Sequence, residues 1–201
     1  MSKPRPADPV KLLASVLASE TVMLNRALIA LSDLCGSFDF ISALMPFDYT
    51  DYYAAEMSSS LLRRFVFFET LIGPETLPDI KIVTNGIEDS LAAQNGRRQV
   101  NIDPGYIALA HLILATGKGY THRPYLRDGI YADLTLVFRD RSFQPLPWTY
   151  PDYLDGKMIE MFNRIREKYV IQLKMGPSVS ESCNACRIEI PHAGLEKGVK
   201  L

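Results

Sequence analysis

The chain has 201 residues, of which 47% are hydrophobic and 22% charged, and its formal net charge is −1. A chain of this length buries about 70% of its unfolded surface, so it needs neither disulfides nor a structural metal to hold a core. The near-neutral charge excludes a global field that would attract nucleic acid or an anionic membrane, and no apolar run is long enough for a membrane-spanning helix. Three cysteines, Cys35, Cys183 and Cys186, fit a reducing compartment, so the sequence predicts a cytoplasmic protein.

The first half of the chain predicts alternating strands and helices. Apolar runs rich in Val and Phe indicate strands, and leucines three or four residues apart, closed by Gly36, indicate a helix. Strands are predicted over 10–19, 37–47, 60–70 and 97–103, and helices over 20–35 and 78–91. This β-α-β-β-α-β order is that of the split βαβ arrangement, so we expect an α+β fold whose ferredoxin-like core spans about residues 10–103.

The second half predicts a helix, a β-meander and a C-terminal helix. Asp103 is a helix-capping residue and Pro104 follows it, which predicts a helix that ends at Gly117. Asp128-Gly129 indicates a hairpin turn, and "FQPL" continues the meander.

Residues 130–138 alternate, with apolar even-numbered residues on one face, and Met158 to Tyr169 marks an amphipathic helix. We therefore expect one globular domain over 1–175, in which residues 104–175 extend the core, and a mobile tail over 176–201.

Two stretches resemble known motifs and fail their tests. Gly117-Lys118-Gly119 lacks the upstream glycine and the following Ser or Thr of a P-loop, and it is expected to follow a helix rather than open one. Cys183 and Cys186 have zinc-ligand spacing, but only His192 lies nearby, whereas a tetrahedral site needs four ligands. The sequence therefore predicts no zinc site at these cysteines.

The clearest charge asymmetry lies between Asp103 and Asp128, where 24 residues contain no acid. This segment carries five basic or titratable residues: Lys118, Arg123, Arg127, His111 and His122. Just before it, Asn101 and Asp103 share one face of the predicted strand and could form a ligand platform. A solvated strand face is the alternative, and for Asp103 alone a helix cap is favoured. His111 lies in an apolar stretch and is interpreted as a core histidine.

His122 can be placed by the register of the predicted hairpin. An even-length loop at Asp128-Gly129 turns His122 toward the face of Tyr131, Asp133 and Thr135. A carboxylate beside an imidazole orients it as a general acid or base; the alternative is a surface pair of little energetic weight. Arg123 then points the other way, unless the strand begins after it.

Two aromatic stretches, "PFDYTDYYAAE" (46–56) and "LPWTYPDY" (146–153), lack the periodicity of core elements. The second contains Trp148, the single tryptophan. Such rings line a ligand cleft or lie over the core, and the sequence favours neither.

The phrases "PFDYTDYY", "RRQVNIDPGYIALAHLILAT", "YTHRPYLRDGIYADLTL" and "PLPWTYPDY" together resemble an uncharacterised prokaryotic family catalogued as a domain of unknown function, DUF4416. The resemblance covers about residues 10–169. It implies no fold, activity or catalytic residue. A GTP-binding label attached to some such proteins gains no support from the failed P-loop test, although nucleotide binding through another site stays open.

The first functional hypothesis is an enzyme or binding protein for an anionic small molecule, a nucleotide or phosphorylated metabolite, held at a polar pocket near residues 97–135. No cofactor is specified. The predicted catalytic residues are His122, Asp133 and Asp103, and the predicted ligand-binding residues are Asn101, Lys118, Arg123, Tyr131 and Trp148. Within this set Asn101 and Asp103 are orienting or metal-contacting groups, and Lys118 and Arg123 are anion clamps.

The second hypothesis is a non-catalytic interaction protein that docks a partner through the loops 46–56 and 146–153. It predicts an exposed aromatic patch at Trp148, Tyr150 and Tyr153. RNA binding through aromatic residues of the sheet ranks last, because the charge is near neutral and the glycines of an RNP-type motif are missing.

Overall fold

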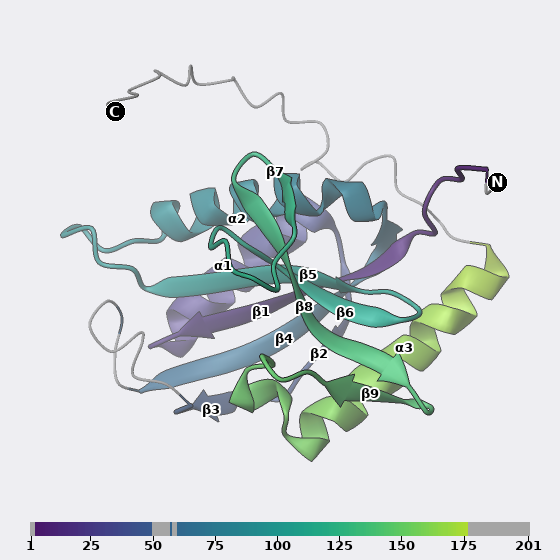
Figure 1. Cartoon of the computed structure of the whole chain (residues 1–201). Helices are drawn as coiled ribbons and strands as arrows, with labels where there is room; N and C mark the ends of the chain where they lie inside the picture. The colour runs from purple at the N-terminus through teal and green to yellow at the C-terminus, as the bar shows by residue number, and fades with distance from the viewer. Residues whose placement is uncertain (1–2, 50–56, 58–59, 177–201) are drawn as a thin grey trace.

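The computed structural model describes residues 3–49, 57 and 60–176, and Figure 1 shows their arrangement. Within these residues the secondary structure consists of three α-helices, two 3-10 turns and nine strands. They follow in the order β1 (Val10–Ala18), α1 (Thr21–Cys35), β2 (Phe38–Ile41), β3 (Met45–Phe47), β4 (Leu61–Ile72), η2 (Pro74–Thr76), α2 (Leu77–Ser90), β5 (Val100–Ile107), β6 (His111–Thr116), β7 (Tyr125–Arg127), β8 (Ile130–Arg139), β9 (Ser142–Pro145), η3 (Pro151–Tyr153) and α3 (Gly156–Met175).

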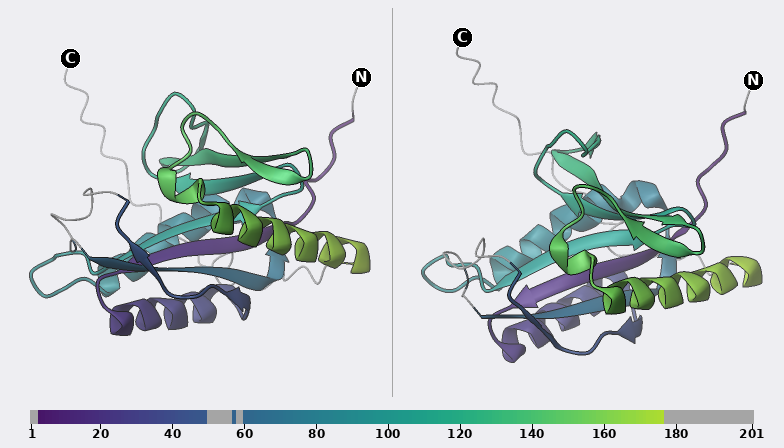
Figure 2. Two further views of the ribbon diagram at one scale, coloured as in Figure 1. Left: turned by 90° about the horizontal axis from the view of Figure 1, so that it is seen from below. Right: turned by 60° about the horizontal axis from the view of Figure 1, so that its bottom comes forward.

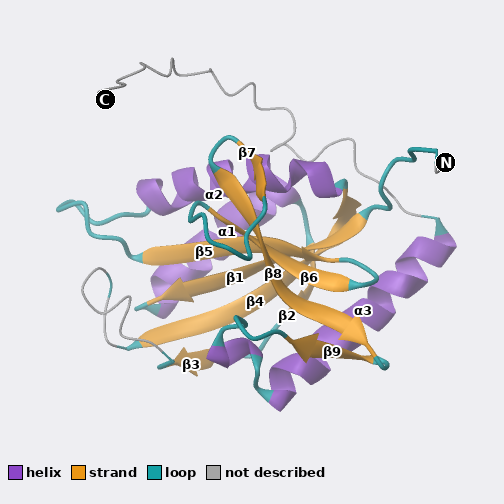
Figure 3. Cartoon of the chain, in the orientation of Figure 1, coloured by secondary structure: helices purple, strands orange, loops and turns teal. Residues whose placement is uncertain are grey.

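All nine strands join one antiparallel sheet (Figure 3). The strand order is β2-β4-β1-β5-β6-β8-β7, with β3 beside β4 and β9 beside β8. The sequence predicted an α+β fold, and this coarse prediction is confirmed by the combination of one large antiparallel sheet with three helices in the described residues. The predicted strand over 37–47 is divided in two, because β2 and β3 pair separately with β4.

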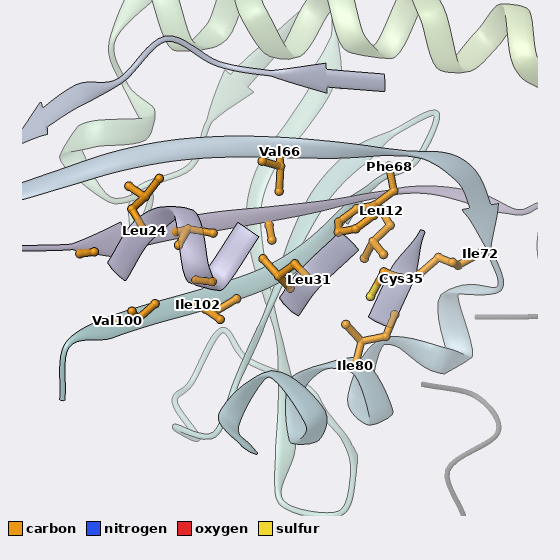
Figure 4. Packing of buried hydrophobic residues seen from close by; sticks show 14 of the residues in the cluster. Leu12, Leu24, Leu31, Cys35, Val66, Phe68, Ile72, Ile80, Val100 and Ile102 are labelled. Atoms are coloured by element: carbon orange, nitrogen blue, oxygen red, sulfur yellow. The ribbon is translucent and has the colours of Figure 1, made fainter. Parts of the chain in front are cut away.

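The helices cover both faces of the sheet. Helices α1 and α2 pack on one face through a core that includes Leu24, Leu31 and Ile80 (Figure 4). Helix α3 covers the opposite face through Phe162, Ile165 and Tyr169, so that α1 and α3 lie on opposite sides of the sheet (Figure 2). Strand β1 is consequently buried along all nine of its residues, which explains why it is apolar except at Lys11 and Ser15.

The helix predicted from Asp103 to Gly117 is wrong. Residues 100–107 form strand β5 and residues 111–116 form β6, an antiparallel pair in which Gly105 faces Leu114. The apolar run is buried as strand rather than helix, an ambiguity that periodicity alone does not resolve. Gly105 is required by the close approach of the strands, since a Cβ there would lie 2.3 Å from the carbonyl oxygen of Ile113.

Pro104 fits inside β5 because the edge of β5 that faces away from β1 has no strand partner at this residue. Pairing with β6 begins only at Gly105. Two residues before Pro104, the backbone of Ile102 faces the same edge of β5. Its N–H donates to Glu88 Oε1 at 2.7 Å, and its carbonyl accepts from Lys81 Nζ at 2.7 Å. Side chains of α2 therefore close the edge, and the missing N–H of Pro104 breaks no ladder bond.

The hairpin predicted at Asp128-Gly129 is present. Both residues have positive φ, 52° and 77°, as a two-residue hairpin turn of this composition requires. The predicted alternation along β8 holds only in its first half, because a bulge shifts the register where Leu112 and Ile113 pair with Leu136 and Leu134. Leu136 therefore packs on the face that carries Asp133.

Several predictions fall outside the described residues, namely most of the loop 46–56 and nearly all of the tail, including Cys183, Cys186 and His192. Among the helices of the described chain, none is both long and apolar enough to cross a membrane.

Candidate functional site

Asp133 is the centre of a polar cluster where β8 passes the loop between β6 and β7. Its side chain is 6% exposed. Arg123 Nε donates to Asp133 Oδ2 at 2.8 Å, and His122 Nε2 lies 3.8 Å from Asp133 Oδ1. The sequence predicted that His122 and Asp133 are neighbours, and the structure brings them together. Arg123 reaches Asp133 as well, contrary to the expectation that it points away. Strand β7 begins only at Tyr125, so both His122 and Arg123 lie in the loop that precedes it.

The loop after β9 covers this cluster. The indole of Trp148 stacks on the His122 ring at 4.9 Å between centroids and 16° between planes. Its Nε1 donates to the Leu134 carbonyl at 2.8 Å, which fixes the ring. Arg123 also donates to the Tyr150 hydroxyl at 2.6 Å and to the Lys118 carbonyl at 3.2 Å. We call these residues, His122, Arg123, Asp133, Trp148 and Tyr150, the Asp133 cluster.

A second polar group lies on β5. Asn101 Nδ2 donates to Asp103 Oδ2 at 2.7 Å, and Arg98 donates to Asn101 Oδ1 at 3.1 Å. Lys81 Nζ lies 3.5 Å from Asp103 Oδ1. Asn101 is buried, whereas the side chain of Asp103 is 34% exposed. Asp103 is therefore accessible from solvent but held on two sides.

Strand register places the two groups on one face of the sheet. Gly105 pairs with Leu114, and Leu114 pairs with Asp133, so Asp103 and Asp133 project to the same side. Two strands across and two residues along correspond to roughly 12 Å between their Cα atoms. Tyr131 and Thr116 pair between them on this same face. The arrangement could therefore hold a ligand that reaches both acids.

The charges of the β5 group are compensated locally. Burial raises the pKa of Glu88, which accepts from Ile102, while the neighbouring charge of Lys81 opposes that shift. In the part of the chain that the structure describes, no group of three or more His, Cys, Asp or Glu side chains could hold a metal ion.

A family model described as a domain of unknown function, DUF4416, matches residues 8–169. The chain belongs to this family. Neither the comparison with curated proteins nor the comparison with solved structures found a match. Membership of DUF4416 supplies no activity, so the chemistry of the site must be argued from its residues.

Two of the predicted site residues have different structural roles from those expected. Asp103 caps no helix, because it lies in β5 opposite Ser15. Lys118 does not follow a helix end, because β6 precedes it; its backbone carbonyl accepts from Arg123. The core histidine His111 is half-buried on β6 with its ring 6.0 Å from that of Tyr106, and burial lowers its pKa.

Sequence reasoning missed three residues at the same sheet face, namely Ser15, Arg63 and Asp152, and it wrongly expected Tyr153 to be exposed, whereas this residue is buried. Arg63 pairs with Asp152 while both side chains are buried. An arginine inside the apolar run "RRFVFFE" was an available signal, because a buried charge requires a partner.

An open depression of about 570 Å³ lies elsewhere, beside Met23, Arg26 and residues 90–95. It contains none of the predicted site residues.

Proposed function

We propose that the chain binds an anionic small molecule, a nucleotide or phosphorylated metabolite, at the sheet face between the Asp133 cluster and Asp103. The observation that carries this proposal is that His122 and Arg123, from the loop before β7, meet Asp133 of β8, and that Trp148, from the loop after β9, stacks on His122. A buried carboxylate that is held by specific charged partners is a candidate for a functional group.

The basic loop beside the cluster supports an anion. Two basic residues, Lys118 and Arg123, lie in the loop between β6 and β7, while Asp133 and Asp103 contribute the negative charges of the proposed site. Arg123 is held by Asp133 and Tyr150, so we assign to it the role of orienting the cluster, and we assign contact with the ligand to the exposed Lys118.

His122 could serve as a general acid or base. The Asp133 carboxylate and the Trp148 ring hold its imidazole on two sides, as a proton-transfer group requires. An enzyme would use His122 for proton transfer, whereas a binding protein would use it only to hold the ligand. A His122→Gln variant that binds ligand as wild type does but loses turnover would identify an enzyme.

A thermal-shift screen against nucleotides and phosphorylated metabolites tests the proposal. We expect at least one compound to raise the melting temperature of the wild type and to raise that of Lys118→Ala much less. Lys174→Ala, an exposed lysine of α3, is the matched control and should respond as the wild type does. If no compound stabilises the wild type more than Lys118→Ala, the proposal is wrong.

Docking of a partner protein is the second candidate. Trp148 and Tyr150 are 39% and 47% exposed, which favours an accessible aromatic surface, although Tyr153 is buried. A pull-down with wild type and Trp148→Ala separates the candidates, because loss of a captured partner with retained ligand response favours docking.

We also infer that β1, α1, β2, β4, α2 and β5 form a ferredoxin-like core. The antiparallel order β2-β4-β1-β5 supports this inference, because the split βαβ arrangement places its first and third strands at the centre. The cytoplasm remains our expectation for its location, on the cysteine content alone.

A further inference from the structure

The open depression of about 570 Å³ lies between the first turns of α1 and the end of α2. Helix α1 lines it with Met23 and Arg26, and the end of α2 and the loop that follows line it with residues 90–95. Sites for small molecules in proteins measure about 300–1,000 Å³. The depression therefore has room for a small molecule, and it shares no residue with the site of the proposed function. We call it the α1–α2 depression.

The loop that forms one wall of the α1–α2 depression is closed by its own hydrogen bonds. The N–H of Ala93 donates to the Arg97 carbonyl at 2.9 Å, and the N–H of Gly96 donates to the Ala93 carbonyl at 2.8 Å. Gly96 has a φ of 76°, in the left-handed region that favours glycine. The wall is therefore formed before any ligand binds, as is usual for small-molecule sites.

Arg26 supplies a positive charge to the α1–α2 depression. The other side chains that line it are neutral. Arg26 is exposed, and within the described residues its guanidinium has neither an ion pair nor a hydrogen bond. Arg63, Arg123 and Arg127, in contrast, are each paired with an aspartate. A guanidinium binds a carboxylate through two parallel hydrogen bonds, so Arg26 is available for the carboxylate of a ligand.

The end of α2 supplies the opposite charge. The last carbonyl groups of a helix have no partner within it and together carry about half a negative charge. No backbone N–H of the described residues donates to the carbonyls of Ser90 and Leu91, which both line the depression. These carbonyls can accept hydrogen bonds from an ammonium group. Phosphate fits less well, because a single arginine faces its two charges and the end of the helix repels it.

We propose that the α1–α2 depression binds a free α-amino acid with an apolar side chain. Its carboxylate pairs with Arg26, and its ammonium group donates to the carbonyls at the end of α2. Its side chain packs on Met23 and Leu91, the two largest apolar side chains that line the depression. The zwitterion is thus oriented by opposite charges on the two helices.

Backbone amide NMR of the full chain, titrated separately with L-leucine and L-phenylalanine, tests the proposal. We expect at least one of them to shift the amide signals of Met23, Arg26 and residues 91–94 in a saturable manner. The corresponding amide, which lacks the carboxylate, and the corresponding acid without the amino group should each bind at least about tenfold more weakly, because each loses one charged contact.

Inorganic phosphate is titrated in parallel. It should leave the signals of Met23 and Arg26 unchanged and reports instead on the proposed function, through residues 118–123. Failure of the amino-acid site and failure of the anion site at the Asp133 cluster are therefore distinguishable.

Arg26→Gln removes the charge that the proposal requires. The variant should keep the melting temperature of the wild type, because the side chain is exposed and Gln is as good a helix former as Arg, and it should bind the amino acid at least about tenfold more weakly. Arg164→Gln, an arginine of α3 with a side chain 75% exposed, is the matched control and should bind as the wild type does. The proposal is overturned if neither amino acid shifts these signals, if the amide or the acid without the amino group binds as tightly, or if Arg26→Gln binds with wild-type affinity.

Discussion

The ion pair between Arg63 and Asp152 gives the sharpest stability prediction. Their side chains are 8% and 6% exposed, and the guanidinium lies 4.4 Å from the centroid of the Phe47 ring and 5.0 Å from that of Phe65. Asp152→Leu removes the carboxylate and leaves the arginine charge among aromatic rings. Removal of one partner of a buried pair costs about 3–5 kcal/mol, which is a large part of a typical stability of about 5–15 kcal/mol.

For a chain of this size, that loss corresponds to a fall in melting temperature of roughly 6–20 °C. Urea denaturation measures the free energy of unfolding directly. The double variant Arg63→Met/Asp152→Leu should recover most of the loss, because an apolar pair replaces the ion pair without an unpaired charge.

The exposed pair Arg164 and Glu160 is the control, since its side chains are 75% and 61% exposed. Glu160→Gln should cost no more than about 0.5 kcal/mol. If Asp152→Leu costs as little as Glu160→Gln, or if the double variant is no more stable than the single one, the buried pair does not hold the η3 loop as argued.

Three further predictions concern single positions. Gly105→Ala should lower the stability by at least about 1–3 kcal/mol, seen as a lower urea midpoint, because the new methyl group collides with the Ile113 carbonyl; an unchanged midpoint would mean that the strands separate freely. Burial lowers the pKa of His111 below 6.5, so the unfolded chain binds its proton first and stability falls as the pH drops below 6.5; His111→Gln should weaken this loss, and an identical pH profile in the variant would contradict it. Because the single tryptophan, Trp148, stacks on His122, its fluorescence emission should differ between the wild type and His122→Gln at the same pH; identical emission spectra would contradict the stacking of the two rings.

Local signals predicted the elements whose conformation is decided locally. Asp128 and Gly129 adopt the positive φ values that a two-residue hairpin turn requires. This turn pairs β7 with β8 and so brings the preceding loop, 117–124, back toward β8. The prediction that His122 and Asp133 are neighbours rested on the hairpin register, but His122 lies outside β7 and the register shifts between Tyr125 and Arg127, so the loop before β7, and not the register, brings His122 and Arg123 to Asp133.

Long-range packing decided the remainder. The segment 104–116 is largely apolar, and periodicity alone did not show that it forms the end of β5 and all of β6, joined by an exposed turn, rather than one helix. The bulge in β8 between Leu134 and Leu136 turns Leu136 to the sheet face that carries Asp133, and no feature of the sequence indicates it. The contact of Tyr150 with Arg123 depends on the position of the loop after β9. That loop is held by the pairing of Asp152 with Arg63, two residues that lie 89 positions apart in the sequence.

The fluorescence of Trp148 tests the central claim most directly, because this ring lies in the Asp133 cluster and no other tryptophan contributes. At constant ionic strength, pyrophosphate or ribose 5-phosphate should change the Trp148 emission saturably in the wild type and in Lys174→Ala, and far less in Lys118→Ala. No saturable change in the wild type, or an equal change in Lys118→Ala, would contradict an anion site at this cluster.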